Sequence, residues 1–102
     1  MTIKQLSIFV ENRSGSLLSI LEMLRDNGIN IVVSTLGDTD GFGIYRLICD
    51  DTEKAFKMLR DKNISATISN VYAIRLSDNK PGAAADVVAK ITKSGVGIKY
   101  MY

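Results

Sequence analysis

The stretch Glu11-Asn12-Arg13-Ser14-Gly15 returns 67 residues later as Asp78-Asn79-Lys80-Pro81-Gly82. The parallel continues without a gap, from the first stretch to Gly28-Ile29-Asn30-Ile31 and from the second to Gly95-Val96-Gly97-Ile98. Each copy therefore has an acid, an Asn, a cation and a Gly, then an apolar segment, then a Gly before β-branched residues. We interpret the chain as a tandem repeat of one α/β unit.

The first copy shows the periodicities of a strand, a helix and a second strand. Residues 3–10 alternate between apolar and polar side chains, which predicts a strand with one buried face. Ser14 is placed to cap a helix whose apolar residues recur at helical spacing. Gly28 is expected to end that helix, and the β-branched residues 29–36 predict a second strand.

The chain then turns back and adds a second helix. Asp38-Thr39-Asp40-Gly41 is a hairpin signal, because Asp-Gly accepts the positive φ of tight turns. It leads to a third predicted strand over 42–49. Asp50 and Glu53 have the spacing of a capping box for a second helix, and residues 64–68 predict a fourth strand.

The resulting order, βαββαβ, predicts an α+β protein with the ferredoxin-like architecture: a four-stranded antiparallel sheet with both helices on one face. We assign residues 1–69 to this complete unit. Residues 70–102 are assigned to the first half of a second unit, with the order β-α-β. Its predicted elements are a strand over 71–76, a helix over 84–91 and a strand from 96 to 102. The third strand, second helix and fourth strand have no counterpart, so we expect an oligomer, most simply a dimer, to protect the exposed edge.

The composition argues against several classes of protein. Hydrophobic residues make up 46% of the chain, charged residues 24%, and the net charge is +2, so there is no strong field for nucleic acid or a membrane surface. No apolar run approaches the ~18 residues of a membrane span, and the N-terminus begins with a strand pattern, so we expect a cytoplasmic protein. Cys49 is the single cysteine and there is no histidine. We therefore expect a buried structural thiol, no metal site and no cofactor.

The repeated loop has chemistry that suits a zwitterion. A helix N-terminus presents free N–H groups and favours a carboxylate or phosphate. Gly15 and Gly82 allow a ligand to approach the backbone, and Asn12 and Asn79 offer both a donor and an acceptor. The alternative is that the glycines serve only as turns and that the two Asn residues only cap their loops.

These motifs resemble those of the ACT domains, a family of small βαββαβ modules that bind amino acids and regulate metabolic enzymes. The family's forms are N-x-P-G after the first strand and G-x-N-I after the first helix. Asn12–Gly15 with Gly28–Ile31, and Asn79–Gly82 with Gly95–Ile98, correspond to these forms. The resemblance covers the whole chain and is nearest to stand-alone bacterial proteins made of two ACT units.

The resemblance implies amino-acid sites at a seam where the edge strands of two units meet. One implied site is formed by Asn79, Pro81 and Gly82 together with Asn30. The other is formed by Asn12, Ser14 and Gly15 together with position 97. Because that position is a glycine and Ser14 replaces the family's proline, we expect the second site to be weaker or empty.

We therefore expect a non-enzymatic regulatory or sensor module that binds a small amino acid, forms a homo-oligomer and acts on a metabolic enzyme. No residue is assigned a catalytic role. One alternative is an interaction module that has lost its ligand site. A less favoured alternative is an acylphosphatase-like hydrolase, in which Arg13 would hold the phosphate. An RNA-binding module is disfavoured, because the predicted third strand has few aromatic residues.

Overall fold

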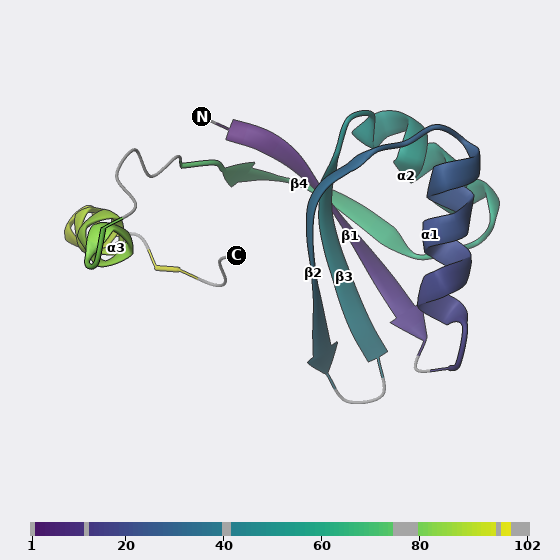
Figure 1. Cartoon of the computed structure of the whole chain (residues 1–102), viewed down its shortest axis with the longest axis horizontal. Coiled ribbons are helices and arrows are strands. Elements are labelled where there is room, and N and C mark those ends of the chain that lie inside the picture. Colours follow the sequence, from purple (N-terminus) through teal and green to yellow (C-terminus); the bar gives the residue numbers. More distant parts are fainter. Residues whose placement is uncertain (1, 12, 40–41, 75–79, 96, 99–102) are drawn as a thin grey trace. The chain divides into compact units, whose positions relative to one another are not determined.

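The first unit, Thr2–Tyr72, has the predicted order βαββαβ (Figure 1). The computed structural model describes residues 2–11, 13–39, 42–74, 80–95 and 97–98. The elements of this unit are β1 (Thr2–Glu11), α1 (Ser16–Asp26), β2 (Ile31–Thr39), β3 (Phe42–Cys49), α2 (Thr52–Asp61) and β4 (Ala66–Tyr72). The strands lie in the order β2-β3-β1-β4 with every neighbouring pair antiparallel, and both helices cover one face. The predicted ferredoxin-like architecture is confirmed.

The core lies between the sheet and the two helices. On β1, Leu6 and Ile8 are fully buried and Val10 nearly so, as their alternation predicted. Leu47 of β3 and Leu59 of α2 are also fully buried in the same cluster. Burying each such side chain contributes about 1.5–3 kcal/mol, so this layer fixes the position of the helices on the sheet. Cys49 is buried with a free thiol, as expected.

Two helices end through the same hydrogen-bonding pattern. After α1, Gly28 has a φ of 72°, and its N–H donates to the Arg25 carbonyl at 3.0 Å. The next amide, of Ile29, donates to the Leu24 carbonyl at 2.9 Å. This pair of bonds is the Schellman motif, so the prediction that Gly28 ends the helix is confirmed. After α2, Asn63 takes the left-handed position with a φ of 59°.

The cap of α2 differs from the prediction by one residue. The carboxylate of Asp51, not that of Asp50, accepts the Lys54 backbone N–H at 3.1 Å. Glu53 does not complete a capping box, because it is the second rather than the third residue after this cap; its carboxylate forms an ion pair with Lys4 of β1. The Asp50 carboxylate instead accepts the backbone N–H of Asn30.

The β2–β3 hairpin is tight and contains one irregularity. Thr39 pairs with Phe42, so two residues, both outside the described part of the chain, connect the strands. At the other end, Ile31 pairs with Cys49 but Val33 pairs with Ile48. Val32 is therefore an extra residue on β2, the arrangement of a β-bulge. Beyond the bulge, Val33 faces the side of the sheet that lies opposite the helices.

In the second unit, Ala73–Tyr102, the predicted helix is present as α3 (Ala83–Lys93). None of its residues is fully buried, although Val87, Val88 and Ile91 are half-buried. The predicted strand over 71–76 is wrong at its start, because Val71 and Tyr72 are the end of β4 and pair with β1. Residues 75–79 of that strand and loop lie outside the described residues. Of the predicted strand from 96 to 102, only Gly97 and Ile98 are described, and neither is in a strand.

Candidate functional site

The two copies of the repeated loop fold into the same turn. Ser16 N–H donates to the Arg13 carbonyl at 3.2 Å, and Ala83 N–H donates to the Lys80 carbonyl at the same distance. The third residue of each turn is a glycine with nearly the same backbone angles: φ 86° and ψ −7° at Gly15, φ 90° and ψ −8° at Gly82. Among the described non-glycine residues only Asn63 has a positive φ, so the second residue of each turn has a negative one. These angles define a type II turn, which requires a residue such as glycine at the third position and favours proline at the second.

This turn explains why the predicted cap is wrong. Ser14 is the second residue of the turn, the position that Pro81 holds in the other copy, and the N-cap position belongs to Gly15. Gly15 and Gly82 have no side chain with which to cap α1 or α3, whereas Asp51 caps α2. Among the described residues, no side-chain cap hydrogen bond is found at the start of α1 or α3. A carboxylate is the natural partner for the N–H groups of a first helical turn.

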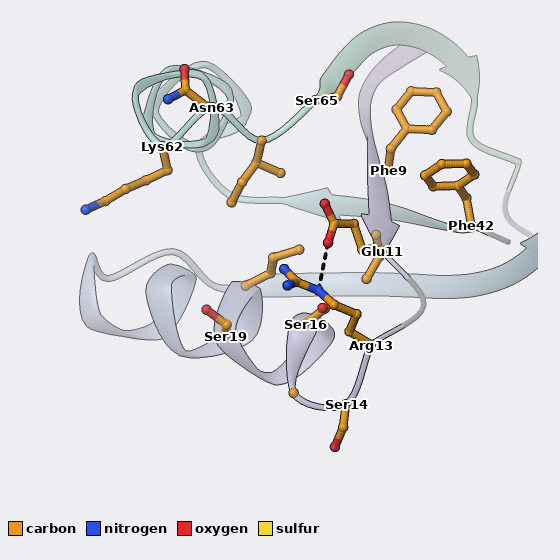
Figure 2. Close-up of a pocket in the computed structure, with 14 residues that line it drawn as sticks. Phe9, Glu11, Arg13, Ser14, Ser16, Ser19, Phe42, Lys62, Asn63 and Ser65 are labelled. Carbon is orange, nitrogen blue, oxygen red and sulfur yellow. Dashed lines mark ion pairs between the residues drawn. The ribbon is translucent and has the colours of Figure 1, made fainter.

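A pocket of about 640 Å³ opens beside the turn of the first unit (Figure 2). Arg13, Ser14 and Gly15 line it on one side. Residues 62–65, which join α2 to β4, line it on the other. A second groove of about 670 Å³ shares Gly15, Ser19, Lys62 and Ile64 with this pocket and continues along α1. The start of α1 therefore faces an open space large enough for a small metabolite.

The pocket contains both signs of charge. Arg13 Nε lies 2.7 Å from Glu11 Oε2, and both side chains remain largely exposed. Lys62 reaches the same pocket from the end of α2. The Ser14 hydroxyl points away from the Arg13–Glu11 pair (Figure 2). The turn therefore presents backbone amides, a cation and a carboxylate to the pocket, but not the hydroxyl that the sequence analysis singled out.

Asn30 lies at the other end of α1, and two backbone contacts fix its position. Its N–H donates to Asp50 Oδ1 at 3.0 Å, and its carbonyl accepts the Asp50 N–H at 3.1 Å. The residue is exposed. Because the eleven residues of α1 span about 16 Å, Asn30 is too far from the Ser14–Gly15 turn of its own unit to share a ligand with it.

The predicted site residues are thus distributed over several places. Ser14 and Gly15 lie together at the pocket, and Asn30 is at the far end of the helix. Pro81 and Gly82 form the matching turn of the second unit. Asn12 and Asn79 are outside the described residues.

Several pocket residues were missed by the sequence analysis, among them Lys62, Asn63 and Ser65. A local signal existed for Asn63, since an Asn directly after a helix is a common left-handed helix end. The proximity of these residues to Gly15 arises only from the packing of α2 and β4 beside α1.

A metal-binding cluster and a membrane-spanning helix were both sought in the described part of the chain. No group of three or more Cys, Asp or Glu side chains there could hold a metal ion. No helix in this part is long and apolar enough to cross a membrane.

Comparisons with known proteins give a consistent result. A family model described as an ACT domain pair matches residues 1–102. The chain is similar to the crystal structure of protein BT0572 from Bacteroides thetaiotaomicron, with a TM-score of 0.93 and 41% identity over 100% of this chain and 70% of that one. No curated protein matches the chain.

Two further solved structures share the fold at low identity. The regulatory subunit of aspartate kinase from Thermus thermophilus has a TM-score of 0.70 and 14% identity, over 100% of this chain and 78% of that one. A chain of the aspartokinase alpha and beta subunits has a TM-score of 0.62 and 16% identity, over 99% of this chain and 78% of that one. At these identities the likeness shows the fold alone.

Proposed function

Because the chain belongs to the family of ACT domain pairs, we propose that it is a regulatory module that binds a small amino acid between ACT units. The proposal rests above all on the two type II turns, at Gly15 and Gly82, which start α1 and α3 without a side-chain cap. In the proposed complex, the amides after each turn hold the ligand's carboxylate, and an Asn side chain holds its ammonium group.

The proposed main site combines Asn79, Pro81 and Gly82 with Asn30. The structure supports a role for Asn30 in one respect: its backbone is held by Asp50 while the residue itself is exposed. A fixed backbone lowers the entropic cost of placing the side chain on a ligand. The proposed weaker site combines Asn12, Ser14 and Gly15 with Gly97, which has no polar side chain.

The outermost strand β2 is a suitable surface for a neighbouring ACT unit. It is an edge of the described sheet, so one side of its backbone has no strand beside it. Val32 and Leu36 on β2 are exposed, as is Leu18 on α1. Pairing along this edge would cover apolar surface and complete backbone hydrogen bonds, which supports the proposed homo-oligomer.

The proposed partner is a cytoplasmic metabolic enzyme, and the proposed role is not catalytic. The Thermus thermophilus protein that shares the fold is the regulatory subunit of an aspartate kinase. The guanidinium of Arg13 forms an ion pair with Glu11, which weighs against its holding a phosphate as in an acylphosphatase. If the protein were such a hydrolase, acyl phosphate would be cleaved and Arg13→Ala would abolish the cleavage.

Thermal denaturation in the presence of each of the twenty amino acids tests the proposal. A ligand at 100 times its Kd adds about 2.7 kcal/mol to the free energy of unfolding, which raises Tm measurably. If none of the twenty raises Tm, the protein is better described as an interaction module without a ligand.

Calorimetry with the amino acid found then tests the site. Asn30→Ala is expected to weaken binding about ten- to a hundredfold, as for loss of a hydrogen bond to a charged group, and Asn12→Ala much less. Asn70→Ala, which removes another exposed Asn, is the control. Equal losses for Asn30→Ala and Asn12→Ala would contradict the proposed asymmetry.

A further inference from the structure

We infer that the helix-free face of the first unit's sheet is a self-association surface, on which two copies of the chain pack face to face. This surface is distinct from the β2 edge, and the inference does not depend on amino-acid binding. The proposed occupant is a second copy of the same face, related by a two-fold axis that runs along β3 over Ile44.

The composition of this face favours burial. Alternation along the paired strands places seven apolar side chains on it: Ile3, Phe9, Val33, Phe42, Ile44, Ile48 and Val71. Phe9, Phe42 and Val33 are 43%, 53% and 40% exposed. Among the side chains described on this face, only Glu11 and Arg46 carry charge. Apart from Gly37, the other described positions on this face are polar. An antiparallel sheet with one solvated face normally has mainly polar residues on that face, so the seven apolar side chains favour partial coverage of it.

One row of residues across the sheet is complementary to itself. Phe9 on β1 pairs with Ile44 on β3, and Ile44 pairs with Gly37 on β2. Along this row the side chains become smaller, from the ring of Phe9 through Ile44 to Gly37, which has no side chain. A two-fold axis along β3 over Ile44 places Phe9 of each copy above Gly37 of the other, since a symmetric interface repeats each contact in reverse.

The first unit itself does not require a glycine at position 37. Its φ is not in the left-handed range, and an added Cβ would have no neighbour closer than Arg46 Nη1 at 3.9 Å. The glycine thus leaves a gap in the row of side chains, beside the Arg46 guanidinium, and neither the backbone nor the core requires it; we call this gap the hollow. A Phe9 ring seated in this hollow would also lie near the Arg46 guanidinium, where a cation–π contact can form.

The size of the face suits a weak, reversible dimer. Four strands about 4.8 Å apart, paired over about 25 Å, give a flat area of about 480 Å² on each copy. Two such faces approach the ~1,000 Å² at which specific interfaces begin. Small side chains such as Ser7, Thr35 and Thr67 flank the row and allow two sheets to approach to about 10 Å.

Sedimentation equilibrium of the full chain over a concentration series tests the inference. The wild type is expected to dimerise reversibly. Gly37→Phe is expected to weaken the dimer at least about tenfold by filling the hollow. It should not lower Tm, because an added Cβ there has no neighbour closer than 3.9 Å and an aromatic residue suits a strand better than glycine. Phe9→Ala should weaken it similarly. The double variant Phe9→Ala/Gly37→Phe moves the large ring from position 9 to position 37 and leaves the gap at position 9. Each ring can then sit in the gap of the other copy, so this variant should dimerise again.

Leu18→Ser is the matched control, because it removes an exposed apolar side chain from α1 rather than from this face. It should leave this dimer unchanged. A wild-type chain that stays monomeric at the highest concentration would overturn the inference. So would a folded Gly37→Phe variant that dimerises as tightly as the wild type, or dissociation by Leu18→Ser but not by Gly37→Phe.

Discussion

Asn30 and Asp50 are joined by two hydrogen bonds: the Asn30 N–H donates to the Asp50 carboxylate at 3.0 Å, and the Asn30 carbonyl accepts the Asp50 N–H at 3.1 Å. The pair ties the segment after α1 to the segment before α2. Asp50 thereby positions a residue of the proposed site without itself belonging to that site.

Asp50→Ala removes the side-chain acceptor of the Asn30 N–H. The free energy of unfolding, measured by urea denaturation, should fall by about 0.5–1.5 kcal/mol, the usual net value of one hydrogen bond. Asp50→Asn keeps an oxygen at this position and should lose less. Equal losses in the two variants would mean that the hydrogen bond is not the cause.

Gly15→Ala places a Cβ on a residue with a φ of 86°. Since the left-handed conformation costs a residue with a Cβ about 1–2 kcal/mol, the urea midpoint should fall accordingly. Gly37→Ala is the control, because its φ lies outside that range. If both variants lose the same stability, the turn does not require its glycine.

Ser14→Pro should stabilise the protein. Ser14 occupies the turn position at which the second unit has Pro81, and proline there restricts the unfolded chain. The expected gain is about 0.4–1 kcal/mol, seen as a higher Tm. A lower Tm would show that the two turns are less alike than their hydrogen bonds and glycine angles indicate.

Asp51→Ala should lower the free energy of unfolding by about 1 kcal/mol, because Asp51 accepts the Lys54 N–H at the start of α2. Ser14→Ala should change it by less than about 0.5 kcal/mol, since Ser14 caps no helix. If Ser14→Ala lost more stability than Asp51→Ala in chemical denaturation, Ser14 would act as a helix cap after all.

The sequence predicts the fold well wherever local periodicity and burial agree. Leu6, Ile8 and Val10 alternate along β1 and are buried, and Gly28 ends α1 as expected. Local rules fail where adjacent residues compete for one role. Asp50 and Asp51 have the same side chain, so either could cap α2. In the folded protein the Asp50 carboxylate binds the Asn30 N–H, which lies nearby only because of the fold, and Asp51 is the cap.

The candidate site is less predictable, because its two sides come from distant parts of the chain. The motif identifies Ser14 and Gly15, but the serine was given a capping role that the left-handed glycine excludes. Lys62, Asn63 and Ser65 reach the pocket through the packing of α2 and β4, for which no local pattern exists. Likewise, the end of β4 at Tyr72 depends on its pairing with Thr2, some seventy positions earlier.

The extra residue at Val32 has a consequence for how this chain and its relatives can diverge in length. Ile31 and Val33 pair with the adjacent residues Cys49 and Ile48, so the bulge takes up Val32 without changing the pairing on either side. A chain without this residue could pair regularly there and keep Leu36 and Gly37 on their present faces. Loss of one codon at this point is therefore expected to be tolerated, whereas a deletion within the regular part of the strand would turn over the residues on one side of it.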